Sequence, residues 1–476
     1  MSLQIILIGS EAKMAGFTGL LAGALLVFAS VGPTCGGGDN FAEERPLDTS
    51  IVVARFDASG SPQSYGVNRY QRLDPSTDWQ TGRDSVWSAT TDAQGRTVIF
   101  GQRRAADRHD KDRLVVRLNA DGRRDASFGT DGSFSFDMGR LDDEGRHGIV
   151  QPDGKIVSAG YVSQPTGVGT QSANRLVLFR LNDNGSLDAT FGVNGVVSSH
   201  PFPSSNPLSD PWGMAEAYAV GLQGSQYVVA GYGRIASSGP VDVVGFRFSS
   251  NGVRDLTWSN AGALVHDVAS DNDRARNLIV LPDNRILIAG SATTAPGNVD
   301  AMLLLLDANG IPDPTFGTSG RRTFSFGGSD EAFFGIALSP DGQWVAAAGH
   351  TSNGASGDSP ILAILPLGAG TEVARRVDVL DVSGSRFTSC LFNAASDRVY
   401  AAGYTTGTAG RELLLAAFQR DGTLDGAFGD AGLVTVDVDE SAQSLDANEI
   451  ARAITRHSDG SLVVVGEAAL PILVDF

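Results

Sequence analysis

Short apolar runs that end in glycine recur along most of the chain. They read TVIFG, IVSAG, YVVAG, ILIAG, VAAAG, VYAAG and LVVVG, at residues 97–101, 156–160, 227–231, 286–290, 345–349, 399–403 and 462–466. Their final glycines are spaced 59, 71, 59, 59, 54 and 63 residues apart, a period of about 61 residues. A period of this length is typical of repeat architectures, in which each copy is one supersecondary unit.

A turn signal precedes most of these runs, and a second apolar run follows each of them except the last. The turns contain Asp-Gly, Gln-Gly, Asp-Asn or Ser-Asp, dipeptides that suit the backbone conformations of tight hairpins. The later runs, such as LVLF at 176–179 and MLLLL at 302–306, are apolar at successive positions. Strands of this kind are buried on both faces, which predicts sheets packed between neighbouring sheets.

A turn of the form Asp-x-x-aromatic, usually followed by glycine, comes after most of the second runs. Its aspartates are Asp125, Asp188, Asp255, Asp313 and Asp425, and its aromatic residues are Phe128, Phe191, Trp258, Phe316 and Phe428. We expect each aspartate to cap its turn through an Asx-type hydrogen bond. We expect each ring to be buried and to pin the loop. A fourth strand follows, for example SFSFDM at 133–138.

Four strands per repeat, about seven repeats and no helix-length periodic segment predict an all-β fold. The expected architecture is a β-propeller of about seven four-stranded antiparallel blades over residues 51–476. A linear β-solenoid is the alternative, but its repeats are shorter. Two further copies of the third-strand pattern lie near the ends of the chain, at 51–60 and 471–476. We therefore expect the two ends to meet in one mixed blade, with Tyr65 in the aromatic position.

The linked motifs resemble the bacterial delta-60 repeat family. The matching segments include SDEAFFGIALSPDGQWVAAAG at 329–349 and RLNDNGSLDATFG at 180–192. The resemblance covers nearly all of residues 51–476, although the unit near 371–385 lacks the Asp-x-x-Phe-Gly turn. It implies an extracytoplasmic repeat protein and brings no catalytic residues.

The N-terminal segment predicts export. Residues 14–31 are an apolar run rich in small residues that ends abruptly at a Gly-Pro pair, so residues 1–34 are expected to be a signal peptide or membrane segment. Cys35 resembles the lipid-attachment cysteine of bacterial lipoproteins, with residues 35–50 as a flexible tether. Gly32 and Thr34 depart from the usual lipoprotein pattern. Acylation of Cys35, cleavage near Ala29 and an uncleaved anchor all stay open, and each places the remaining chain in the cell envelope or in a secreted or periplasmic form.

Charge and residue usage narrow the partners. Acidic residues outnumber basic ones 54 to 36, a formal charge of −18, so nucleic acid is not an expected partner. Lysine occurs only three times, and none of the three lies in a phosphate-binding P-loop. The chain has two cysteines, and acylation or removal of Cys35 would leave Cys390 without a disulfide partner.

Candidate chemistry is sparse. The six histidines show no metal-ligand spacing, and no G-x-S-x-G motif occurs. Acidic stretches at 141–144, 270–273, 329–331 and 437–440 lie before first strands. They could converge at the mouth of a central channel and hold Ca²⁺ weakly, although solvated loops or strand-start caps are the simpler interpretation. We expect no catalytic residues, no transition metal and no cofactor other than such weak calcium.

Two classes of function fit these observations. The first, which we favour, is a monomeric envelope scaffold that presents loops to a protein or glycan without catalysis. The alternative is a propeller enzyme, a lyase or glycan-active hydrolase that uses paired carboxylates at the channel mouth. The fold alone does not decide between them, because propellers host many unrelated functions.

Overall fold

The computed structural model describes residues 48–66, 70–74, 84–104, 110–139, 142–165, 172–199, 214–235, 239–268, 271–352, 357–367, 373–376, 384–407, 410–438 and 448–470. The chain divides into two compact units, residues 1–45 and 46–476, and all described residues belong to the second. The expected signal segment and Cys35 lie outside the described residues. No helix in the described part is long and apolar enough to cross a membrane.

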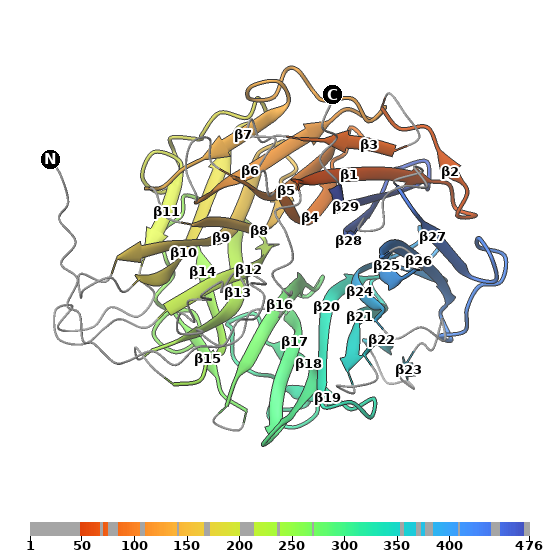
Figure 1. The fold of residues 1–476 in the computed structure, drawn as a ribbon. Helices are drawn as coiled ribbons and strands as arrows, with labels where there is room; N and C mark the ends of the chain where they lie inside the picture. The colour runs from red at the N-terminus through yellow and green to blue at the C-terminus, as the bar shows by residue number, and fades with distance from the viewer. Residues whose placement is uncertain are drawn as a thin grey trace, which may run out of the picture. The chain divides into compact units, whose positions relative to one another are not determined.

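The second unit is built from four-stranded antiparallel sheets, which we number as blades in chain order (Figure 1). Blade 1 consists of β4 (Ser85–Thr91), β5 (Thr97–Arg104), β6 (Lys111–Leu118) and β7 (Ser133–Phe136). Blade 2 consists of β8 (Asp143–Val150), β9 (Ile156–Pro165), β10 (Ser172–Leu181) and β11 (Val196–Ser199). Blade 3 consists of β12 (Met214–Gln223), β13 (Gln226–Arg234), β14 (Asp242–Phe248) and β15 (Leu264–His266). Blade 4 consists of β16 (Asp273–Val280), β17 (Ile286–Ala295), β18 (Asn298–Leu306) and β19 (Arg321–Phe324). Blade 5 consists of β20 (Asp330–Leu338), β21 (Trp344–Ser352), β22 (Asp358–Pro366) and β23 (Val373–Arg376). Blade 6 consists of β24 (Arg386–Phe392), β25 (Arg398–Thr406), β26 (Arg411–Gln419) and β27 (Leu433–Val436).

Blade 7 is built from both ends of the chain. It contains β28 (Asn448–Arg456), β29 (Leu462–Leu470), β1 (Asp48–Phe56) and β3 (Tyr70–Leu73), and the short β2 (Pro62–Gln63) pairs with the end of β1. Strand β1 runs antiparallel to β29 over its whole length, from Asp48 opposite Leu470 to Phe56 opposite Leu462. This pairing confirms the expected mixed blade. Strand β1 begins within the segment expected to be the tether, and residues 471–476 lie outside the described residues.

The first strands of the blades form a closed inner ring. Each first strand contacts the next one in the order β4, β8, β12, β16, β20, β24 and β28, and β28 contacts β4 again (Figure 1). The prediction of a propeller with about seven blades is therefore confirmed. We call the side of the ring at which the first strands begin the upper face. Because successive strands are antiparallel, third strands also begin at the upper face and fourth strands end there.

The hydrophobic core is divided among the seams between blades. Seven clusters of buried residues each combine side chains from two successive blades. In the seam between blades 1 and 2, for example, Phe100 of β5 packs in one cluster with Phe179 of β10. Each sheet therefore buries both faces, which explains why its inner strands carry apolar residues at successive positions.

Candidate functional site

The first strand of every blade carries a β-bulge at the same place. In each pairing of a first with a second strand, the register shifts by one residue. A β-bulge leaves one residue out of the ladder and redirects its side chain. The seven residues at the shift, which we call the axial ring, are Trp87, Arg146, Tyr218, Arg276, Phe334, Thr388 and Arg452. All seven stand on the innermost strands, near their upper ends.

Aromatic residues and arginines alternate around most of the axial ring. The guanidinium of Arg146 lies 3.9 Å from the ring centroid of Trp87 and 4.8 Å from that of Tyr218. Arg276 lies 5.3 Å from Tyr218 and 5.5 Å from Phe334. These spacings are within cation–π range. The chain of contacts therefore crosses blade boundaries from blade 1 to blade 5.

The cation–π contacts of the axial ring also join blade 1 to blade 7, but they do not include blade 6. The guanidinium of Arg452 in blade 7 lies 4.9 Å from the ring centroid of Trp87 in blade 1. Between Phe334 and Arg452 stands Thr388, whose hydroxyl lies 2.6 Å from the carbonyl oxygen of Ala451 and donates to it. Thr388 is thus tied to backbone and adds neither a ring nor a charge.

The three arginines differ in their acidic partners. Arg146 forms an ion pair with Glu144 at 2.6 Å, and Arg452 forms one with Glu467 at 2.6 Å. Among the described residues, no carboxylate lies within ion-pair distance of Arg276. Arg276 is half-buried, so its guanidinium keeps part of its surface in solvent. It is a cation held only by two aromatic side chains.

Buried carboxylates surround the arginines. Burial alone would raise the pKa of Glu144, but Arg146 and Lys111 hold it below its ordinary value. Glu216 has the opposite shift, because burial raises its pKa more than Arg146 lowers it. Burial also raises the pKa of Tyr218, so this tyrosine stays neutral and its ring faces remain available to cations.

A buried acidic residue lies three positions before the axial-ring residue in five of the seven blades. These residues are Asp84, Asp143, Asp273, Glu331 and Glu449, each at most 1% exposed. Four of them accept a backbone N–H from the segment after the preceding fourth strand: Met138 to Asp143, Val268 to Asp273, Phe326 to Glu331 and Val438 to Glu449. The acidic stretches noted in the sequence therefore supply links between blades. Leu141, Ser270, Asp439 and Glu440 of those stretches lie outside the described residues.

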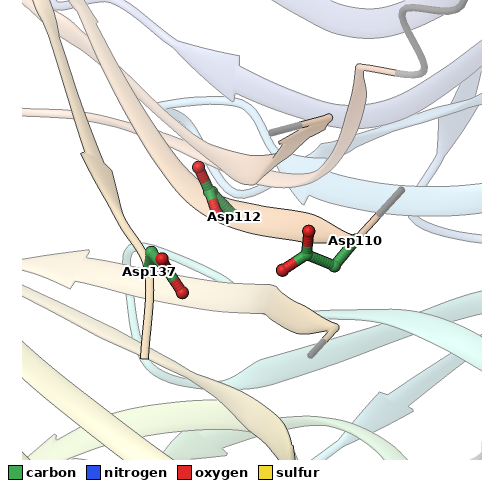
Figure 2. Close-up of side chains that lie close together, drawn as sticks. All are labelled: Asp110, Asp112 and Asp137. Atoms are coloured by element: carbon green, nitrogen blue, oxygen red, sulfur yellow. The ribbon is translucent and has the colours of Figure 1, made fainter. Parts of the chain in front are cut away.

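Two groups of carboxylates stand at the upper face, each close enough to share a cation. Figure 2 shows the first, in which Asp110 and Asp112 at the start of β6 lie near Asp137, which follows β7. The second group is Asp242, Asp267 and Asp273, and within each group the nearest ligand atoms lie within 4.8 Å of one another. They lie in separate blade seams rather than converging at the ring axis. Clustered carboxylates of this kind are hard-oxygen ligands of the type that Ca²⁺ accepts.

Like charges and burial shift two carboxyl groups at these seams. The pKa of Asp143 is raised to about 7, mainly by burial, with a further contribution from Asp137 and Asp112. The pKa of Asp273 is raised to about 6 by burial and by Asp267 and Asp242. Both side chains are fully buried.

The Asp-x-x-aromatic turns lie at the opposite, lower face. Each aspartate accepts the backbone N–H of the residue two positions on, at 3.0 Å for Asp125, 3.0 Å for Asp188, 2.9 Å for Asp255, 3.0 Å for Asp313 and 3.2 Å for Asp425. Phe128, Phe191, Trp258 and Phe428 are fully buried, whereas Phe316 is only half-buried. These residues lie at the other end of the strands from the axial ring. The aspartates bond within their own blade, for example Asp125 to Arg117, whereas the buried rings pack against the next blade.

Each buried ring of these turns sits beneath a glycine of the next blade. A Cβ atom on Gly185 would lie 3.0 Å from Phe128, and one on Gly310 would lie 2.3 Å from Trp258. Both glycines have positive φ, which other residues adopt only with strain. At ring closure, Tyr65 of blade 7 is fully buried against Gly122 of blade 1.

Burial also shifts the pKa values of the described cysteine and of one histidine. Burial raises the pKa of the Cys390 thiol to about 12, so the reactive thiolate is not formed near neutral pH. Burial lowers the pKa of His147 to about 4, which leaves a neutral imidazole. His109 and His200 lie outside the described residues.

Comparison with known proteins supports the fold. Residues 151–191 and 281–316 match the sequence profile of a family described as a domain of unknown function (DUF5122) β-propeller. No curated protein matches the chain. With the closed ring described above, this match defines the chain as a β-propeller repeat protein.

Three solved structures are among those that match the chain. Hydrazine synthase from Kuenenia stuttgartiensis is 12% identical, with 82% of this chain and 96% of that chain covered at a TM-score of 0.43. Sqt1 from Chaetomium thermophilum, bound to the N-terminus of ribosomal protein L10, is 13% identical over 81% and 96% at 0.42. A PL25 ulvan lyase bound to a sulfated saccharide is 12% identical over 78% and 88% at 0.43.

Sequence reasoning missed the axial ring. Its arginines and aromatics fall among ordinary polar and apolar residues of the first strands, and no single one stands out. An alignment of the first strands on their buried acidic residue would have revealed the axial ring. In the five blades that have this acidic residue, the residue three positions after it is Trp, Arg, Arg, Phe and Arg. The bulge itself has no such signature in one copy of the repeat.

Proposed function

We propose that this chain is an exported, non-catalytic binding scaffold of the cell envelope, which presents the upper face of its propeller to a protein or glycan. The observation that carries the proposal is the axial ring, in which Arg276 is held between Tyr218 and Phe334 without an acidic partner. Arginines and aromatic residues are the side chains that most often dominate recognition. Their concentration at one place on an acidic protein favours binding there.

Binding explains the axial ring better than catalysis does. A carboxylate-based enzyme needs two carboxyl groups about 5 to 10 Å apart, both reachable by substrate. The second candidate, a lyase or glycan-active hydrolase, is favoured by the raised pKa of Asp143, about 7. However, Asp143 is fully buried and its carboxylate accepts the backbone N–H of Met138, an arrangement that suits a link between blades.

The cell-envelope address rests on the N-terminal sequence and on the resemblance to delta-60 repeat proteins. An apolar run followed shortly by Cys35 resembles the arrangement of an acylated lipoprotein, although Gly32 and Thr34 depart from its usual pattern. In our proposal, residues 1–34 are absent from the mature protein, and Cys35 carries acyl chains that tether a monomeric propeller to a membrane. A strongly acidic scaffold of this kind avoids nucleic acid.

Fatty-acid labelling tests this address. Labelled fatty acid should enter the wild-type protein and be lost in Cys35→Ala, with Cys390→Ala as the matched control that keeps its label. Equal labelling of wild type and Cys35→Ala, or a mature N-terminus at Ser30, would leave a secreted or periplasmic protein and end the lipoprotein proposal.

A retention experiment tests the binding role. The full chain is immobilised, and solubilised envelope material from the source cells is passed over wild type and over a variant that combines Arg146→Gln with Arg276→Gln. Material that is retained by wild type, lost with the variant and released chemically unchanged supports a scaffold. Release of a shortened or unsaturated saccharide supports the enzyme instead, and equal retention by both proteins rules out the axial ring as the binding surface.

A further inference from the structure

We infer that the axial ring binds a sugar acid, a uronate residue of an acidic glycan, with its carboxylate on Arg276. This inference rests on the proposed binding function and names the ligand class. It is carried by three properties of the site: an arginine without an acidic partner, buried polar atoms without hydrogen bonds, and aromatic surface between the charges.

The first property requires an anion. Arg276 is the one arginine of the axial ring that has no ion pair among the described residues, although the chain carries a formal charge of −18. Tyr218 and Phe334 hold its guanidinium on two sides. A guanidinium binds a planar carboxylate through two parallel hydrogen bonds, and one fixed in advance between two rings loses little freedom when it does so.

The second property requires hydroxyl groups. One carboxylate oxygen of Glu467 is buried and accepts no hydrogen bond, and the carboxylate of Glu216, which is 4% exposed, accepts only from its neighbours Asn174 and Tyr232. Near them, the indole N–H of Trp87 and two donor nitrogens of Arg146 are also buried without acceptors. Unpaired buried polar groups are costly. A ligand with both donors and acceptors, as a ring of hydroxyl groups provides, would satisfy them.

The same two glutamates argue against simpler anions. Sulfate or an ionised acidic side chain offers acceptors only, and a carboxylate such as Glu216 repels it. A hydroxyl group, by contrast, donates to a carboxylate and accepts from an arginine in the same site. A polyhydroxylated anion therefore fits the mixture of charges better than a bare anion.

The third property fits a pyranose ring. Trp87 and Phe334 are half-buried. Arg146 and Arg452 lie against Trp87, and Phe334 contacts Arg276 and stacks on His350 at 5.4 Å, so a ligand meets the edges of these rings rather than free faces. A sugar ring has apolar C–H surface that can contact such edges, whereas a phosphate group has none. The combination of anionic, hydroxyl and apolar recognition within one ring of side chains points to a uronate.

Isothermal titration with defined oligosaccharides tests the inference. The probes are the trimers of galacturonate, glucuronate and mannuronate, together with the methyl ester of each trimer and sodium sulfate. The full chain should bind at least one trimer with a submillimolar Kd, and its methyl ester should bind at least about tenfold more weakly, the effect of a lost charge-assisted contact. Sulfate should not compete at equal concentration.

Substitutions place the carboxylate. Arg276→Gln should weaken the acidic trimer about tenfold or more and bring it to the level of the methyl ester. Arg123→Gln is the matched control, because Arg123 is an exposed arginine of a lower-face turn, and it should leave Kd unchanged. Because Arg276 has no ion pair and only two cation–π contacts, its substitution should lower the melting temperature by no more than about 2 °C, which separates lost binding from lost folding.

The outcomes separate the ligand class from the binding function. If no trimer binds below millimolar concentration, or if the ester or sulfate binds as well as the acid, the sugar-acid inference is wrong. The scaffold still stands in that case, provided that wild type retains envelope material and the arginine variant does not. If Arg276→Gln binds the acidic trimer as tightly as wild type, the site assignment is wrong.

Discussion

The aromatic residue of each lower-face turn should determine stability in proportion to its burial. Phe128 is fully buried, its ring faces the guanidinium of Arg117 at 4.5 Å, and it lies beneath Gly185 of the next blade. Phe316 occupies the corresponding place in blade 4 but is half-buried. Phe128→Ala should therefore cost about 3–5 kcal/mol of unfolding free energy, the usual range for a buried phenylalanine. Phe316→Ala should cost roughly half as much, about 2 kcal/mol.

These energies convert into small but measurable shifts in melting temperature. At about 2.1 cal/mol/K per residue, a unit of roughly 430 residues has an unfolding entropy near 0.9 kcal/mol/K. Phe128→Ala should then lower the melting temperature by about 3–6 °C and Phe316→Ala by about 2 °C, provided that the ring unfolds in one transition. A closed ring in which every seam shares residues with both neighbours favours a single transition.

Urea unfolding followed by tryptophan fluorescence, together with calorimetry, measures both variants. Phe128→Leu is the matched control, since it keeps most of the buried volume and should cost less than about 1.5 kcal/mol. Equal costs for Phe128→Ala and Phe316→Ala, or a cost below 1 kcal/mol for Phe128→Ala, would refute the argument that these rings hold successive blades together.

Three further predictions concern closure, pH and calcium. A chain starting at residue 57 loses β1 and exposes the edge of β29, so it should aggregate, whereas a chain starting at residue 46 should fold; size-exclusion chromatography distinguishes them. Because the folded pKa of Asp143 is raised to about 7, its carboxyl favours folding less as pH rises from about 4 to 7, so Asp143→Asn should gain stability relative to wild type by a few kcal/mol across that window. A pH-independent difference between the two urea midpoints would contradict this. Millimolar Ca²⁺ should raise the melting temperature by at most about 2 °C, and a larger rise that Asp112→Asn abolishes would reveal a calcium site at the group in Figure 2.

The repeat could be predicted from sequence because every copy must satisfy the same packing and turn requirements. Every blade packs on two neighbours, so runs such as LVLF at 176–179 must be apolar on both faces, and the turn residues recur where a tight hairpin needs them. The mixed blade followed from the surplus strand at 51–60. These features depend on burial and local turn chemistry, both of which a single sequence records.

The axial ring could not be predicted in this way, because it depends on a shift of register. A bulge turns one side chain out of the alternation that identifies a strand, so Arg146 and Arg276 appear as ordinary polar residues of a half-buried strand. The acidic stretches could be recognised in the sequence, but the place of their side chains in the fold could not be predicted. Whether Asp143 faces the axis or a blade seam depends on the neighbouring blade, which the local sequence does not specify.

The number of blades explains why the proposed arginine site occurs once in the axial ring. Two kinds of side chain can alternate without a fault only around an even number of positions, and this propeller has seven. The alternation of arginine and aromatic residues is broken at Thr388, whose hydroxyl donates a hydrogen bond to a backbone carbonyl. This break leaves Arg452 with one aromatic neighbour and an ion pair to Glu467, while Arg276 keeps two aromatic neighbours and no ion pair. A ring assembled from repeats is thus made asymmetric by its odd number, and a ligand should bind with a stoichiometry of one per chain.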